Sequence, residues 1–178
     1  GAVRRYLQAK GELSKESLTA LMPISTRSKS QGSDSGNQVG MVPVPLRSDI
    51  IDPIERLRGA RKGSSASKGA SSALGHDFSA KLIQIMPAFA AEAIINHGMV
   101  PMCNTTVSNV RGPSVPLYMA GSKLQVFLPV SIPFNGIGLN MTGFSYNGML
   151  WVCFVCCRSM MPDPKFFREC LNESFAEI

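Results

Sequence analysis

Two polar residues, Ser108 and Asn109, stand at the end of a run rich in β-branched side chains. The run Thr105–Val110 has the composition of a strand. The Gly112-Pro113 pair that follows joins a residue without a Cβ to one whose φ is fixed. A rigid turn of this kind can hold a hydroxyl and an amide in position to hydrogen-bond a ligand in a cavity. The alternative interpretation is an ordinary exit from a strand into a loop.

Histidine is the side chain most often used as a general base, and the chain has only His76 and His97. His76 precedes a predicted helix. His97 stands in Asn-His-Gly at a predicted helix end, where the helix dipole favours it. Neither histidine belongs to a recognisable catalytic arrangement. We therefore predict no catalytic residue in this chain.

Cys153, Cys156 and Cys157 have the spacing of half a zinc site. No second cysteine or histidine pair follows, and on a strand Cys156 faces away from the other two. We predict small core residues and no metal. Five cysteines, an odd number, suit a reducing compartment better than a disulfide framework. We therefore expect a cytoplasmic protein, with attachment to the surface of a membrane or lipid inclusion as an open alternative.

The net charge of +6 arises entirely from the first part of the chain. Residues 1–68 hold twelve Lys or Arg and six Asp or Glu, whereas the remainder holds six of each. Such a cluster attracts the phosphates of a cofactor, anionic lipid or nucleic acid, unless it is simply a solvated helix face. Nucleic acid is disfavoured because Tyr6 is the only aromatic residue before Phe78. The densest basic portion is Arg56, Arg58, Arg61, Lys62 and Lys68.

Local signals place the elements that would position these residues. Asp52-Pro53 and Asp163-Pro164 each start a helix, Gly11 ends one, and Pro87 interrupts another. Asn147-Gly148 predicts a type I′ hairpin turn. Pro43 and Pro45 favour an edge strand. We expect helices at 1–10, from residue 52, at 78–97 and at 163–178, and strands at 17–26, 38–46, 102–110, 122–130, 138–146 and 149–157, with a polar, mobile loop at 26–37.

The length of 178 residues, 44% of them hydrophobic, is enough for one core, and no apolar run is long enough to span a membrane. Helices and strands interleave without a regular βαβ repeat. The fold class predicted is α/β (α+β), a mixed sheet with covering helices. The apolar region 78–97 is expected to form buried helices, with a membrane-surface helix as the alternative.

An ordered set of motifs resembles the C-terminal half of bacterial wax ester synthase/diacylglycerol acyltransferases. The resemblance spans the whole chain. Three residues depart from the family pattern. The family usually has proline where this chain has Arg111, and relatives often carry Asp where this chain has Cys157 and Ser159. The motifs are Gly1–Leu7, Met22–Arg27, Gly36–Gly40, Leu46, Asp52–Leu57, Ser108–Pro113, Pro116–Tyr118, Gly138–Asn140, Ser145–Gly148 and Pro162-Asp163.

The resemblance implies one lobe of a fold similar to chloramphenicol acetyltransferase and to condensation domains. It also implies transfer of a fatty acyl group from acyl-coenzyme A, as co-substrate, to a long-chain alcohol or a diacylglycerol. The base would be a histidine of a His-His-x-x-x-Asp-Gly motif in an N-terminal half. Residues 1–10 would then end a helix of that half, and residues 11–178 would form the C-terminal domain.

On this interpretation, Ser108, Asn109, Gly112, Pro113 and Asn140 line the substrate tunnel. Arg56, Arg58, Arg61 and Lys62 would meet coenzyme A phosphates or a lipid surface. The chain alone would be inactive, because its N-terminal partner carries the base. The rival hypothesis is a non-catalytic module that binds lipid or a membrane surface through the basic first third and the apolar helices. Nucleic acid is not expected as a partner.

Overall fold

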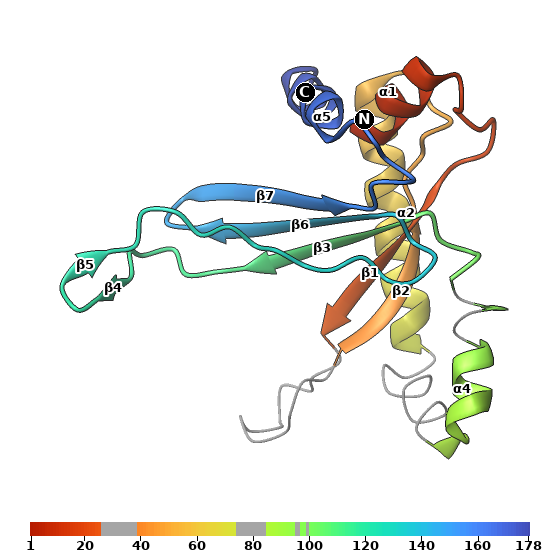
Figure 1. The fold of residues 1–178 in the computed structure, drawn as a ribbon, viewed down its shortest axis with the longest axis horizontal. Coiled ribbons are helices and arrows are strands. Elements are labelled where there is room, and N and C mark those ends of the chain that lie inside the picture. The colour runs from red at the N-terminus through yellow and green to blue at the C-terminus, as the bar shows by residue number, and fades with distance from the viewer. Residues whose placement is uncertain (26–38, 74–84, 95–96, 99) are drawn as a thin grey trace.

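A five-stranded mixed sheet forms the centre of the molecule in the computed structural model (Figure 1). The structure describes residues 1–25, 39–73, 85–94, 97–98 and 100–178. The strand order is β2-β1-β3-β6-β7, in which β1, β3 and β6 are parallel and the two outer strands are antiparallel to their neighbours. The strands are β1 (Thr19–Ser25), β2 (Val39–Pro45), β3 (Thr105–Arg111), β6 (Leu139–Tyr146) and β7 (Met149–Cys156).

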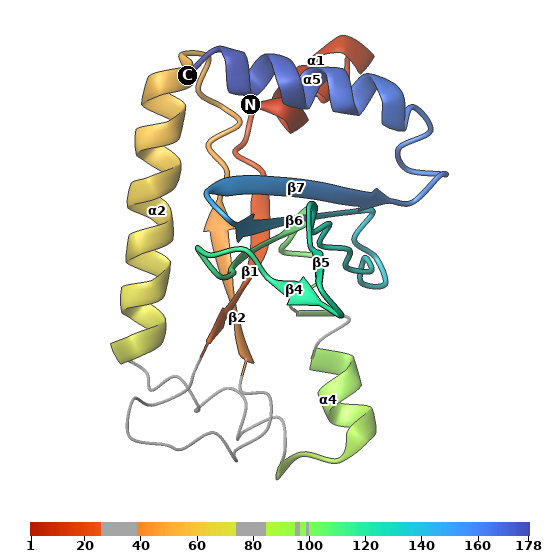
Figure 2. The same cartoon turned by 90° about the vertical axis from the view of Figure 1, so that its left-hand side faces the viewer.

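Two terminal helices cover part of one face of the sheet, which we call the helix face. They are α1 (Ala2–Lys10) and α5 (Pro164–Ala176), which pack against each other. Tyr6 and Phe167 form the centre of this core, and Phe167 is fully buried. Leu139, Met141, Phe154 and Cys156 contribute from the strands. Figures 1 and 2 show both helices above β7, with the two termini near each other.

A long helix, α2 (Pro53–Ala73), packs against the edge strand β2 (Figure 2). Asp52 caps its start as expected, accepting a hydrogen bond of 2.7 Å from the backbone N–H of Glu55. The short helix α4 (Ala88–Ile94) begins directly after Pro87. The structure corrects the expectation of buried helices here: α4 has no buried residue, and Phe89 is 76% exposed.

Most local predictions are confirmed. Gly11 ends α1 with φ 73°, and both residues of the Asn147-Gly148 turn have positive φ, as a type I′ turn requires. Pro43 and Pro45 lie on an edge strand. The polar loop 26–37, His76 and the first part of the apolar region 78–97 lie outside the described residues.

The strand predicted at residues 122–130 is wrong for most of its length. Only β5 (Ser122–Lys123) is a strand, paired with β4 (Tyr118–Met119). These two strands belong to an arm, residues 113–123, which projects from the sheet in Figure 1. Residues 124–137, the strap, run back across the second face of the sheet without regular pairing. Pro129 and Pro133 lack the backbone donors that a central strand needs.

Candidate functional site

A row of polar side chains crosses the second face of the sheet, beneath the strap; we call this the strap face. In β3 and β6, Thr106 is paired with Asn140 and Ser108 with Thr142. Paired residues of neighbouring strands point to the same face. Thr106, Asn140 and Thr142 are only 3%, 4% and 5% exposed. Central parallel strands are ordinarily apolar on both faces, so a polar row at this position requires a specific explanation.

Asn140 and Thr142 hold the strap in place. The Asn140 side-chain amide donates to the carbonyl oxygen of Ile132 at 2.9 Å. The Thr142 hydroxyl lies 3.1 Å from the Ser131 hydroxyl and 3.2 Å from the Asn140 amide oxygen. The hydrogen-bonding capacity of these two side chains is therefore largely used within the fold.

Thr106 and Ser108 have no such partner among the described residues. The Thr106 hydroxyl is buried and makes no hydrogen bond within the described part of the chain, although a buried polar group without a partner costs about 1–3 kcal/mol. Thr106, Ser108 and Asn140 border a cavity of about 440 Å³. Its other walls are mainly apolar: Pro23, Met41, Val130, Ser131, Ile132 and Phe134. The cavity thus places Ser108 among mainly apolar walls, and the buried Thr106 hydroxyl lies beside it.

The structure places the predicted site residues in three different settings. Ser108 and Asn140 meet at the cavity. Asn109 points to the opposite face, where its side-chain oxygen would lie 3.3 Å from a Cβ added at Gly143. Gly112 and Pro113 instead fix the end of β3 on the β6–β7 hairpin. The backbone N–H of Gly112 donates to the Ser145 hydroxyl at 3.2 Å, and Pro113 accepts from the backbone N–H of Asn147 at 3.0 Å.

Thr106 and Thr142 were not among the site residues predicted from the sequence. A polar residue at every second position of two β-rich runs was the available signal, in Thr106 and Ser108 and again in Asn140 and Thr142. That pattern is weak by itself, because threonine and serine also occur on the exposed faces of strands.

The basic cluster is also divided. Arg56 is 7% exposed, which corrects the expectation that it lies on a solvated face open to phosphates. Its guanidinium donates to the carbonyl oxygens of Ile50 and Ile51, each at 3.0 Å, and to Glu177 at 3.1 Å. Arg58, Arg61 and Lys62 are exposed on α2.

The cysteines and His97 offer no further catalytic arrangement. Within the described residues no group of three or more His, Cys, Asp or Glu side chains is placed to hold a metal. Cys156 packs against the core, but Cys157 is exposed, contrary to the prediction of a core residue. His97 contacts the carbonyl oxygen of Ala93 at 3.2 Å, as expected for a residue at a helix end. No described helix is long and apolar enough to cross a bilayer.

Comparison with known proteins identifies the family. The family model described as the WS/DGAT C-terminal domain matches residues 35–178. The O-acyltransferase WSD of Acinetobacter baylyi is 34% identical over 165 residues, which cover 91% of this chain but 35% of that protein. The solved structure of a wax ester synthase/diacylglycerol acyltransferase from Marinobacter aquaeolei superimposes with a TM-score of 0.73 at 28% identity, covering 99% of this chain and 39% of that one.

The predicted fold class, a mixed α/β lobe similar to chloramphenicol acetyltransferase, agrees with this structural neighbour. The chain spans less than half the length of these relatives and aligns with one portion of each. It belongs to the wax ester synthase/diacylglycerol acyltransferase family and corresponds to its C-terminal half.

Proposed function

We propose that this chain forms the C-terminal half of an acyl-coenzyme A-dependent O-acyltransferase, whose catalytic histidine stands on a separate N-terminal half. The reaction would transfer a fatty acyl group to a long-chain alcohol or a diacylglycerol. The observation that carries the proposal is the mainly apolar cavity bordered by Ser108, with the buried and unpartnered Thr106 hydroxyl beside it. Long-chain substrates match such a cavity, because apolar walls bury the chain while a hydroxyl can donate to a carbonyl oxygen.

In this proposal, Ser108 and Thr106 contact substrate, and Asn140 and Thr142 hold the strap that closes one wall. Asn109, on the opposite face, has no access to this cavity. Gly112 and Pro113 position the end of β3, since their backbone groups hydrogen-bond to the β6–β7 hairpin. Neither His97 nor any cysteine lines the cavity, which supports a base supplied by the N-terminal half.

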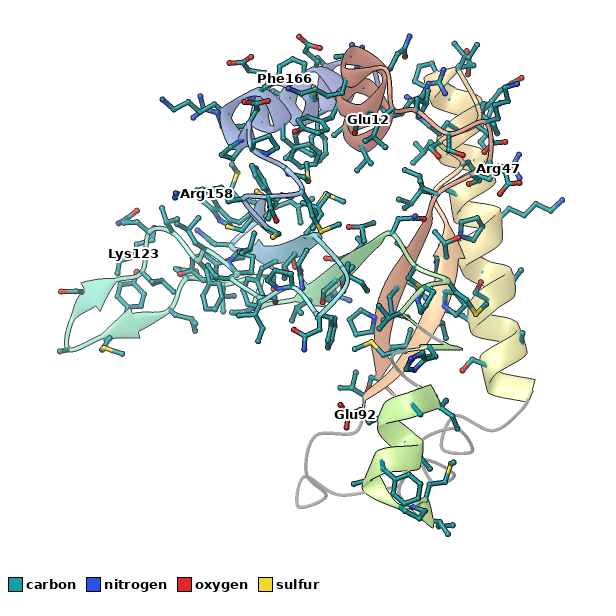
Figure 3. The ribbon with its side chains drawn as sticks, turned by 45° about the vertical axis from the view of Figure 1, so that its right-hand side comes forward. Glu12, Arg47, Glu92, Lys123, Arg158 and Phe166 are labelled. Atoms are coloured by element: carbon teal, nitrogen blue, oxygen red, sulfur yellow. The ribbon has the colours of Figure 1, made fainter. Side chains whose placement is uncertain are left out.

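The arm and strap support the proposed N-terminal partner. Large apolar side chains are exposed along both segments, including Met119 at 83%, Leu128 at 60% and Val130 at 74% (Figure 3, in which Lys123 marks the arm). An exposed apolar surface of this extent marks an interface. No backbone hydrogen bond joins residues 125–131 to another described segment. The strap therefore offers a second half both apolar side chains and free backbone groups.

The test is acyl transfer from palmitoyl-coenzyme A to hexadecanol. We expect no turnover by the purified chain alone. Activity should appear when the chain is combined with the N-terminal half of the Acinetobacter baylyi relative. The two halves of that relative, mixed in the same way, control for assembly of a split enzyme. Clear turnover by the chain alone, or none in a mixture that demonstrably assembles, would contradict the proposal.

A further inference from the structure

Helix α2 has two chemically different faces. Its inner face carries small residues that let it approach β2 and the following linker: Gly63 lies against Pro45, where an added Cβ would come within 2.6 Å of the ring, and Gly59 lies against Arg47. Arg56, on the same inner side, is the buried residue that contacts α5 through Glu177. Since an α-helix turns by about 100° per residue, the side chains between these positions project away from the sheet.

The outer face is basic. Arg58, Arg61 and Lys62 are exposed at positions i, i+3 and i+4, where side chains on a helix are neighbours. None of them forms an ion pair with another described residue. Like charges at this spacing destabilise a helix, and α2 already contains three glycines. The cluster therefore weakens the isolated helix, and a negatively charged partner would remove that penalty.

Apolar side chains border these cations. Ile54 lies one turn before Arg58 and is 38% exposed, and Leu57, one turn before Arg61, is 48% exposed. No residue of α2 lines the cavity that contains Thr106 and Ser108. Figure 2 shows α2 beside β2, at one edge of the sheet. The cations are therefore placed apart from the proposed substrate site, and the group that they attract need not be a substrate bound there.

We propose that the outer face of α2, formed by Ile54, Leu57, Arg58, Arg61 and Lys62, docks on an anionic phospholipid surface. Basic side chains over an anionic membrane are attracted to its surface potential, and bordering apolar side chains can enter the headgroup region. A flat surface suits an unpaired helix face, whereas a single coenzyme A would need a concave site. This docking is independent of the acyltransferase proposal, because none of its residues belongs to the cavity.

The experiment is flotation of the purified chain with phosphatidylglycerol-containing vesicles and with neutral phosphatidylcholine vesicles. We expect binding to the anionic vesicles only, and loss of that binding at about 0.5 M salt, where charges are strongly screened. The variant R58E/R61E/K62E should bind on the order of 100-fold more weakly, since each basic side chain near such a surface strengthens attachment roughly fivefold. Circular dichroism checks that the variant folds.

The matched control is R158E/K165E/R168E, which makes the same change in net charge at exposed residues away from α2. It should bind within about twofold of the parent chain, since these side chains lie outside the docking face. The variant I54S/L57S leaves the charge unchanged and should reduce binding. Three outcomes would overturn the proposal. The first is an equal loss of vesicle binding in the control variant, and the second is equal binding of the parent chain to neutral vesicles. The third is coenzyme A binding that disappears in R58E/R61E/K62E while vesicle binding persists.

Discussion

The Thr106 hydroxyl is buried in the middle of the strap face and has no hydrogen-bond partner in the described part of the chain. Its neighbours across the strands, Asn140 and Thr142, are engaged with each other and with the strap. A buried group without a partner destabilises the fold, so its presence beside a cavity is typical of a binding site rather than of a core. At the residue scale, removal of this hydroxyl should therefore raise the stability of the fold and lower the activity of the assembled enzyme.

Thr106→Val tests that separation. The change keeps the shape and removes the unpartnered hydroxyl, so the free energy of unfolding should rise by about 1 kcal/mol. In the assembled enzyme, kcat/KM should fall about tenfold through loss of one hydrogen bond to substrate. Thr106→Ser retains the hydroxyl and should keep most of the activity. A variant with unchanged kcat/KM would show that the hydroxyl does not contact substrate.

Gly112→Ala should destabilise the fold, because a Cβ there would collide with the Ser145 carbonyl oxygen and the Phe144 ring. Overpacking of this kind costs about 1–3 kcal/mol. Gly69→Ala is the matched control: no atom lies within 4 Å of the added Cβ, and alanine should stabilise α2 by about 1 kcal/mol. Urea denaturation measures both. An unchanged midpoint for Gly112→Ala would refute the close packing of this turn.

Cys157 should be the cysteine that reacts first with a thiol reagent. A hydrogen bond with the Ser159 hydroxyl at 3.1 Å, followed by the backbone N–H groups of Ser159 and Met160, lowers the pKa of this exposed thiol. Burial raises the pKa of Cys103, Cys156 and Cys170.

The thiolate is the reactive form, so a lowered pKa keeps Cys157 reactive at a pH where Cys103, Cys156 and Cys170 are protonated. The labelling rate of Cys157 should decline as the pH falls through its pKa. Mass spectrometry after brief iodoacetamide treatment should find Cys157 labelled about tenfold faster than Cys103, Cys156 and Cys170. The Ser159→Ala variant should label more slowly at Cys157. Equal labelling of Cys103 would contradict the assignment.

At the scale of elements, three helices distant in sequence meet at one carboxylate. Glu177, directly after α5, is bound by Arg5 of α1 and, at 3.1 Å, by Arg56 of α2. Arg5 also pairs with Glu173 at 3.1 Å. Because Arg56 is buried, its desolvated guanidinium depends on Glu177 and on the two carbonyl oxygens that precede α2. Glu177 therefore fixes α2 relative to the helix pair.

Glu177→Ala should lower the free energy of unfolding by about 2 kcal/mol, because it leaves a buried cation without its charged partner. Glu173→Ala is the control. Its side chain is 62% exposed, and surface ion pairs contribute about 0–1 kcal/mol. Thermal unfolding followed by circular dichroism compares the two variants. Equal effects would show that the charge on Arg56 is satisfied without Glu177.

At the scale of the whole molecule, the arm and strap give the chain a large apolar surface with no covering layer among the described residues. Two hydrogen bonds hold the strap: the Tyr146 hydroxyl donates to the carbonyl oxygen of Leu124 at 2.8 Å, and the Asn140 side-chain amide donates to that of Ile132 at 2.9 Å. Between these points, Phe127 stacks on Phe144 while Val126, Leu128 and Val130 are exposed. This surface can be changed without disturbing the core.

The variant V126S/L128S/V130S should leave the stability of the chain nearly unchanged, because substitutions at exposed positions typically alter it by about 0.5 kcal/mol or less. Assembly with the N-terminal half should weaken at least about tenfold, since burial of even one of these side chains contributes roughly 1.5–3 kcal/mol. Analytical ultracentrifugation of the mixed halves gives the affinity. The matched variant, I51S at an exposed residue before α2, should assemble normally. Undiminished assembly of the triple variant would place the interface elsewhere.

The sequence by itself determined the local features of this protein. The Asp52 cap, the Gly11 stop, the Asn147-Gly148 turn and the edge strand with Pro43 and Pro45 depend on neighbouring residues and on backbone angles, and all agree with the structure. The family resemblance rested likewise on short motifs in a fixed order. These features are readable because their physical causes act within a few residues.

Only the tertiary structure decided which polar residues meet. Ser108 and Asn109 are adjacent in sequence, but a strand sends neighbours to opposite faces, and the β3–β6 register brings Ser108 beside Thr142 while Asn109 faces away. Burial of Arg56 depended on Glu177, 121 positions later. The strap looked like a strand because its composition suits extended backbone, but a strand also requires a partner, and pairing is a property of the whole fold.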